Sequence, residues 1–105
     1  MKAMTDWETA IWQLHSLSME MLSLAQSSEW QIVTEREEQR RILMDQLFAN
    51  PPPAEWVSLF QDTIQTVLAS DAQVQVLAHA EMDKLSNDIR MLKQRRRALQ
   101  AYEDL

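Results

Sequence analysis

The sequence contains no glycine, and its only three prolines are consecutive, at Pro51, Pro52 and Pro53. Glycine adopts positive φ angles without steric cost and lets other groups approach the backbone closely. Tight β-turns and phosphate-binding loops both depend on it for these reasons, so its absence disfavours sheet-rich folds and nucleotide-binding loops. The remaining sequence is rich in good helix formers such as Ala, Leu, Met, Gln, Glu and Arg. We therefore predict an all-α fold.

The size and charge of the chain narrow the function classes. A length of 105 residues predicts a single helical domain, residues 1–105, with one modest core. The absence of cysteine excludes disulfides, and together with the lack of a signal-like N-terminus it favours a cytoplasmic location. Polar residues interrupt the apolar ones throughout, so we expect no membrane insertion. The net charge of −6 argues against direct nucleic-acid binding, which depends on clustered positive charge.

A first helix is predicted over residues 7–25. Thr5 and Glu8 have the spacing of a capping box, in which a hydroxyl and a carboxylate satisfy free backbone N–H groups at a helix N-terminus. Apolar residues then recur at helical spacing and form a broad apolar face. These residues are Trp7, Ile11, Leu14, Leu17, Met21 and Leu24.

A second helix is predicted over residues 29–48, with Ser28 and Gln31 as its capping box. Its apolar residues lie near the two ends, whereas the middle is charged. Glu37 and Arg40 occupy positions in the helical stripe where apolar residues would be expected, and a spacing of three allows them to pair. The short connection between the two helices predicts an antiparallel hairpin.

A long third helix is predicted over residues 54–102, because the three prolines end the second helix and no glycine or proline follows. Its stripe follows alternating steps of four and three, which is heptad-like spacing. The stripe consists of Phe60, Ile64, Leu68, Asp71, Gln75, Ala78, Met82, Leu85, Ile89, Leu92, Arg96 and Leu99. One continuous helix is predicted, with a bend or split near Ser70-Asp71 as the alternative, because these residues also suit a cap. The whole is a three- to four-helix bundle.

No arrangement of side chains typical of catalysis is found. His15 and His79 lie on different predicted helices, without further ligands at metal-binding spacing. Glu35, Glu37 and Glu38 are close in sequence but face no second carboxylate pair at a defined distance. No nucleophile with a base and an orienting partner can be identified either. We therefore predict that the protein is not an enzyme and needs no cofactor or metal.

The second half of the third helix carries apolar residues that nothing else in the chain is predicted to cover, and exposed stripes of this kind usually bind a partner. Its predicted partner-binding residues are Val74, Leu77, Ala78, Met82, Leu85 and Ile89. Glu37 and Arg40 are predicted either to fix the partner's register or to hold the second helix to its neighbour. Arg95, Arg96 and Arg97 are predicted either to attract an acidic partner or to offset the helix dipole.

Over roughly residues 12–104 the chain resembles the FliT-type flagellar export chaperones. The resemblance begins at Trp12-Gln13-x-His15 and Met21-Leu22-x-Leu24-Ala25, and continues with Trp30, Glu37 and Arg40. It is clearest in Leu68-Ala69-Ser70-Asp71-x-x-Val74-x-x-Leu77, Met82-Asp83-x-Leu85 and Leu99-x-Ala101-Tyr102-x-Asp104. The family has helix-breaking residues before its C-terminal segment, whereas residues 86–97 are predicted here to be continuously helical.

This resemblance implies a cytoplasmic chaperone that binds the C-terminal region of the filament-capping protein before type III export. It also implies contacts with the export ATPase complex and, in some enteric bacteria, with the flagellar master transcription activator, which such chaperones restrain. From the residues alone, a homodimeric coiled-coil structural or adaptor protein is the alternative, because the stripe can pair with a second copy.

Overall fold

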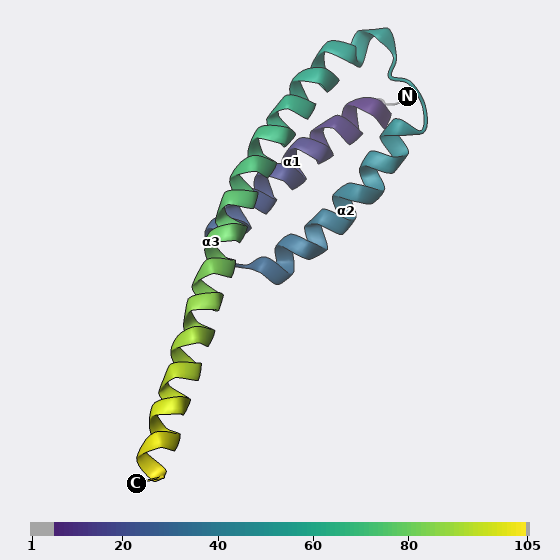
Figure 1. Cartoon of the computed structure of the whole chain (residues 1–105). Helices are drawn as coiled ribbons and strands as arrows, with labels where there is room; N and C mark the ends of the chain where they lie inside the picture. Colours follow the sequence, from purple (N-terminus) through teal and green to yellow (C-terminus); the bar gives the residue numbers. More distant parts are fainter. Residues whose placement is uncertain (1–5, 105) are drawn as a thin grey trace. The chain divides into compact units, whose positions relative to one another are not determined.

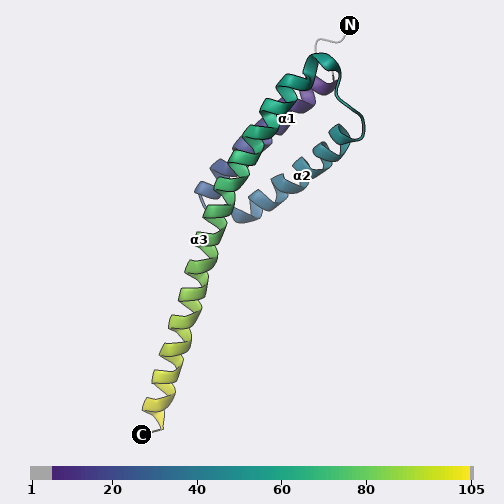
Figure 2. The ribbon, with the colours of Figure 1, turned by 45° about the horizontal axis from the view of Figure 1, so that its top comes forward.

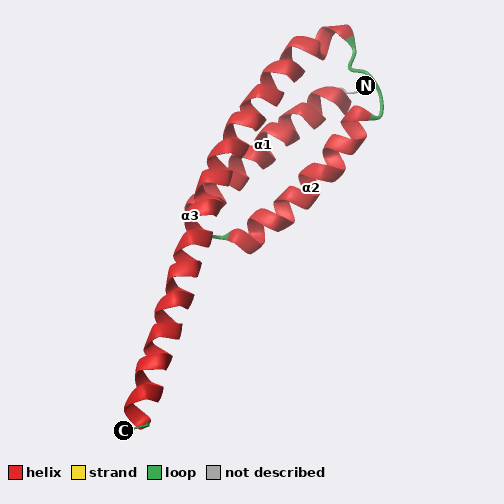
Figure 3. Ribbon diagram, in the orientation of Figure 1, coloured by secondary structure: helices red, strands yellow, loops and turns green. Residues whose placement is uncertain are grey.

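The structure, a computed structural model, describes residues 6–104, which fold into three α-helices without a strand in that range (Figures 1 and 3). Helix α1 covers Asp6–Gln26, α2 covers Trp30–Phe48, and α3 covers Val57–Glu103, preceded by a 3₁₀ turn, η1, at Ala54–Trp56. The predicted all-α fold, a helical hairpin followed by a long third helix, is confirmed. The predicted bounds lie within three residues of the observed ones.

Helix α3 is a single helix of 47 residues. Ser70 and Asp71, where a bend or split was the alternative prediction, lie inside it. The hydroxyl of Ser70 donates to the carbonyl of Val67 at 2.9 Å, so it bonds back within the helix and caps no new one. The chain divides between Gln75 and Val76 into two compact units. The first unit holds α1, α2 and the start of α3, and the second holds the rest of α3.

The turn between α1 and α2 is closed by backbone hydrogen bonds. The N–H of Glu29 donates to the carbonyl of Leu24 at 2.9 Å, and the N–H of Ser28 donates to the carbonyl of Ala25 at 3.0 Å. This is the Schellman pattern, which requires a left-handed residue after the helix. Ser28 takes that conformation, with a φ of 59°.

The predicted capping box of Ser28 and Gln31 is therefore wrong. The N-cap of α2 is Glu29, and no side chain caps this end of the helix. Ser28 instead ends α1, because a chain that reverses within three residues needs its left-handed position there. Of the other predicted capping box, Thr5 lies outside the described residues.

The three prolines separate α2 from α3. Pro53 has a φ of −57° and a ψ of 147°, and its carbonyl accepts a hydrogen bond from the N–H of Trp56 at 2.9 Å. Proline suits this position because its fixed φ matches the start of a helix and its missing N–H has no partner there. The chain then enters α3 through η1.

All three helices contribute to the core of the first unit, and one cluster of buried residues joins Leu14, Leu47 and Val67. The views agree that α1, α2 and the first part of α3 lie side by side (Figures 1 and 2). At one end of this core the ring of Phe60 meets that of Trp7 edge-on at 5.6 Å and that of Phe48 at 5.8 Å. Edge-to-face packing of this kind is the favoured geometry for aromatic pairs.

The buried face of α3 in the first unit differs from the predicted stripe. Thr63, Val67 and Ser70 are buried, whereas the predicted Leu68 exposes 63% of its surface. The observed face follows the same steps of four and three but is shifted by one residue. Two of the three buried residues on this face, Thr63 and Ser70, carry small hydroxyl side chains.

Candidate protein-binding surface

Apolar side chains are exposed along the second unit, residues 76–104 of α3. Met82, Leu85 and Ile89 expose 63%, 53% and 53% of their surface. Together with Ala78, Leu92 and Leu99 they follow heptad spacing, which places them on one face of the helix. We call these six residues the apolar stripe. A continuous apolar face of this kind usually marks a binding site.

Other exposed apolar residues of this unit lie away from the apolar stripe. Val76 and Met91 expose 69% and 60% of their surface. With 3.6 residues per turn, both project from other sides of the helix than Leu85 and Ile89. They resemble the stripe residues in size and exposure and differ from them in direction.

A basic run follows along the same segment: Arg90, Lys93, Arg95, Arg96 and Arg97. All five side chains are exposed, and none forms an ion pair with another residue in the described part of the chain. Arg96 continues the heptad spacing of the apolar stripe, and Arg95 and Lys93 lie on either side of it. The charge is therefore adjacent to the apolar surface and available to an acidic group.

The predicted partner-binding residues of α3 differ in their surroundings. Val74 belongs to the first unit and is half-buried. Leu77 and Ala78 belong to the second unit and are also half-buried. Met82, Leu85 and Ile89 are exposed. Whether any of them contacts a partner stays a prediction.

Arg40 lies where α1, α2 and α3 meet. Its Nη1 donates to Asp71 Oδ1 at 2.8 Å and to Ser18 Oγ at 3.1 Å, and its Nη2 donates to Asp71 Oδ2 at 3.0 Å. The side chain of Arg40 is 10% exposed and that of Asp71 is 33% exposed. This is a bidentate guanidinium–carboxylate pair, which combines charge with fixed geometry.

The pairing of Glu37 with Arg40 that the spacing suggested is wrong. Arg40 turns into the bundle toward Asp71, because a buried guanidinium needs a counter-charge within reach. Glu37 stays exposed on α2, without a hydrogen bond or ion pair in the described part of the chain. Of the two roles predicted for Arg40, holding α2 to its neighbours is the one its contacts support.

Ser18 and Asp71 were not predicted as partners of Arg40. A signal existed, since Arg40 and Asp71 are both polar interruptions in the stripes of different helices and carry opposite charges. The two opposite charges can pair only if the two residues lie at the same level along their neighbouring helices. That alignment is a property of the tertiary structure.

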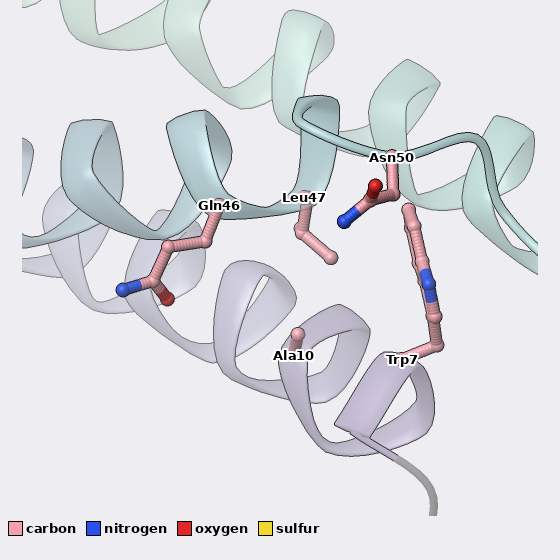
Figure 4. Close-up of a pocket in the computed structure, with 5 residues that line it drawn as sticks. All are labelled: Trp7, Ala10, Gln46, Leu47 and Asn50. Carbon is pink, nitrogen blue, oxygen red and sulfur yellow. The ribbon is translucent and has the colours of Figure 1, made fainter.

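An open pocket of about 280 Å³ lies between the start of α1 and the end of α2 (Figure 4). It is lined by Trp7, Ala10, Gln46, Leu47 and Asn50. The side chains of Trp7 and Asn50 lie close together at one end of it, and that of Gln46 lies at the other (Figure 4). This lining contains no acid, base or nucleophile, so the pocket offers no group for catalysis.

In the part of the chain that the structure describes, metal-ligating side chains do not gather elsewhere. Within residues 6–104 no three His, Cys, Asp or Glu side chains lie close enough to hold an ion. The ring of His15 meets that of Trp12 edge-on at 6.3 Å. No helix in the described range is long and apolar enough to cross a membrane.

A family model described as "Flagellar protein FliT" matches residues 8–104. The chain belongs to the FliT family of flagellar proteins. The resemblance noted over residues 12–104 is thereby confirmed. No curated protein and no solved structure matches the chain.

The FliT family match covers both compact units. It includes the contact of Arg40 with Asp71 as well as the apolar stripe and the basic run. The family description assigns the chain to the flagellar proteins. The candidate binding surface of this FliT-family chain is defined by the exposed apolar stripe and the adjacent basic run.

Proposed function

We propose that this FliT-family protein is a cytoplasmic type III export chaperone. In this proposal it holds the C-terminal region of the filament-capping protein before export. The observation that carries it is the apolar stripe on α3, where Met82, Leu85 and Ile89 are each more than half exposed in a chain of a flagellar family. A chaperone needs such a surface, because it must cover apolar residues of a client that is not yet assembled.

The shape of the surface favours an amphipathic helical client. The apolar stripe runs along one helix face, so a client helix would meet it with residues at i, i+3, i+4 and i+7. Met82 suits this role because its flexible, polarizable side chain adapts to different neighbours. The basic run would attract acidic residues that flank the client's apolar face.

The test compares two double variants in binding to the C-terminal segment of the host's filament-capping protein. Met82→Glu with Leu85→Glu places two carboxylates on the apolar stripe, and should weaken binding by at least about tenfold, because burying an unpaired charge is costly. Val76→Glu with Met91→Glu places the same charges on other sides of the same segment, and should change binding little. Circular dichroism checks that both variants stay helical. Equal binding by the two variants would show that the client does not bind at the apolar stripe.

Finer roles belong to the same proposal. The family resemblance implies contact with the export ATPase complex and with the flagellar master activator. The exposed carboxylates of Glu35, Glu37 and Glu38 on α2 favour a basic partner surface of the kind found on a DNA-binding activator. In a gel shift, the protein should release the activator from DNA, and a Glu35→Gln, Glu37→Gln variant should not. Equal release by both proteins would contradict a role for this surface.

A further inference from the structure

A further cleft lies in the first unit between α1 and the start of α3, which run side by side (Figures 1 and 2). We call it the α1–α3 cleft. Its volume of about 220 Å³ is below the roughly 300–1,000 Å³ of pockets that enclose a small-molecule ligand, so it suits a single side chain. Its lining residues are Ile11, Trp12 and His15 from α1, and Leu59, Asp62, Thr63 and Thr66 from α3.

Three polar side chains of the α1–α3 cleft have oxygens that no donor satisfies. The carboxylate of Asp62 forms no hydrogen bond or ion pair within residues 6–104. The hydroxyl of Thr66 donates its one hydrogen to the carbonyl of Asp62 at 3.2 Å, so it can only accept from a ligand. Thr63 is 6% exposed, and its hydroxyl has no hydrogen-bond partner in the same range. Leaving a buried hydroxyl unpaired is costly, which favours a ligand rich in donors.

The surroundings of the α1–α3 cleft are negatively charged. Neither α1 nor residues 57–75 of α3 contains a lysine or an arginine. The three cations of residues 6–75 lie on α2, and each already pairs with a carboxylate: Arg36, Arg40 and Arg41. Asp62 therefore gains a counter-charge only if a partner brings one, so the cleft favours a cationic side chain.

Trp12 and the apolar lining determine which cation fits. Trp12 exposes 51% of its surface, and the ring of His15 meets it edge-on at 6.3 Å, which leaves at least one face of the indole open. A guanidinium is planar, stacks on an indole face and offers five N–H donors, whereas an ammonium is a compact point charge. Ile11 and Leu59 can pack against the aliphatic stem of the same side chain. These features favour arginine over lysine.

We propose that the α1–α3 cleft binds one arginine side chain from a positively charged segment of another protein. The guanidinium lies between the indole of Trp12 and the carboxylate of Asp62, and it donates to the hydroxyls of Thr63 and Thr66. The cleft belongs to the first unit and the apolar stripe to the second, so the proposal holds with or without a client on the stripe.

An NMR titration with short peptides is the first measurement. The probe is a blocked five-residue peptide with arginine at its centre and alanine elsewhere. It should shift the indole N–H of Trp12 and the amides of Asp62 and Thr66, and saturate in about the millimolar range expected for a single side chain. Lysine at the centre should bind at least about threefold more weakly, and uncharged citrulline should cause no saturable shift. Equal binding of the three peptides, or no saturation with arginine, overturns the proposal.

Substitutions locate the site. Asp62→Asn and Trp12→Leu should each weaken binding of the arginine peptide by at least about fivefold, because one removes the counter-charge and the other the stacking face. Asp83→Asn and Tyr102→Leu make similar changes at exposed positions of the second unit and should leave the affinity unchanged. Circular dichroism checks that all four variants stay helical. Equal losses in the two pairs of variants overturn the placement in the cleft.

Thr63→Val separates binding from folding. Valine keeps the shape of threonine and removes only the hydroxyl, which has no partner in the free protein. The variant should therefore unfold at the same or a higher temperature and yet bind the arginine peptide at least about threefold more weakly. A variant that binds the peptide as the wild type does contradicts the role of the buried hydroxyl.

The arginines of the basic run are the competing occupants. A variant with Arg95→Gln, Arg96→Gln and Arg97→Gln is titrated with the same arginine peptide. An affinity equal to that of the wild-type protein supports an occupant from another protein. A higher affinity, with shifted signals of Trp12 and Asp62 before any peptide is added, means that the protein's own arginines fill the cleft, and overturns the proposal.

Discussion

The guanidinium of Arg40 is nearly enclosed, and its two terminal nitrogens, Nη1 and Nη2, point at the two oxygens of Asp71. A charge in such a place is tolerated only with a partner, because removing it from water is costly. The third contact, to Ser18, ties the same side chain to α1. One residue of α2 thus fixes the axial positions of α1 and α3 relative to α2.

Removing one partner of this pair should destabilise the fold. Asp71→Ala leaves Arg40 buried without a counter-charge, and should lower the free energy of unfolding by about 2 kcal/mol in urea. This is less than for a fully buried pair, because the Asp71 side chain is one-third exposed. Glu37→Ala, at an exposed and unpaired position of α2, should change the free energy by less than about 0.5 kcal/mol. Equal effects would mean that the pair contributes nothing.

Ser28 holds a left-handed conformation that glycine adopts at lower cost. Ser28→Gly should therefore raise the free energy of unfolding by about 0.5–1 kcal/mol, after the extra flexibility of glycine in the unfolded chain is counted. Ser27→Gly is the matched control, since Ser27 has a negative φ and should lose stability or stay unchanged. Thermal unfolding of both variants checks the difference. A stabilised Ser27→Gly would contradict the assignment of the turn.

The contribution of Glu38 to the stability of the fold depends on pH. The guanidinium of Arg41 donates to its carboxylate and lowers the pKa of Glu38 below its ordinary value. A carboxyl group with a lowered pKa contributes stability above its unfolded pKa and loses it as the pH falls through the folded pKa. In an NMR titration, Arg41→Ala should raise the pKa of Glu38. Arg36→Ala should leave the pKa of Glu38 unchanged, because Arg36 pairs with Glu20. An equal rise in the pKa of Glu38 in the Arg36→Ala protein would mean that the loss of any nearby positive charge causes the shift.

At the scale of elements, the buried residues of α3 follow the predicted heptad spacing but lie one residue away from the predicted positions. Its heptad spacing is present in the sequence, yet the side that packs on α1 and α2 is the one with Thr63 and Ser70. Large apolar residues such as Leu68 lie beside this side, not on it. Burial on this face therefore includes small hydroxyl side chains as well as the apolar Val67.

A pair of opposite substitutions distinguishes the two phases. Ser70→Leu introduces a large side chain at a position that is 2% exposed, and should lower the free energy of unfolding by about 1–3 kcal/mol through overpacking. Leu68→Ser removes one at a position that is 63% exposed, and should cost less than about 0.5 kcal/mol. Urea unfolding of both variants gives the comparison. A larger loss of stability in Leu68→Ser than in Ser70→Leu would mean that the predicted stripe, with Leu68, is the buried face.

At the scale of the whole molecule, one helix serves two compact units. The start of α3 is held by buried residues such as Val67 and by the contact of Asp71 with Arg40. The second unit has exposed side chains from Met82 to Asp104. A helix without packing is marginal in water, because propensity alone contributes little. Stability should therefore differ strongly within α3.

Hydrogen exchange at low protein concentration should reveal this difference. Amides of residues 60–72 should exchange slowly, and amides of residues 82–99 should exchange faster by orders of magnitude, because local opening there breaks few contacts. Uniform protection along α3 in the most dilute sample would contradict the division into two units.

Local signals in the sequence determined the helices. The proline run, the absence of glycine and the periodic apolar residues located three helices to within three residues at every end. They also located the apolar stripe, since its residues are apolar at heptad spacing regardless of what surrounds them. The family followed from the order of short motifs along the chain. All of these are properties of neighbouring residues, which the backbone geometry of a helix is sufficient to interpret.

The tertiary structure alone decided which residues meet across helices. Arg40 pairs with Asp71, 31 positions away, and not with Glu37 on its own helix. Ser28 ends α1 and does not begin α2, and Ser70 is buried while Leu68 is exposed. Each outcome depends on the distance and height at which helices pack. Sequence spacing specifies the face of one helix, but the alignment of two helices results from the fit of all their side chains together.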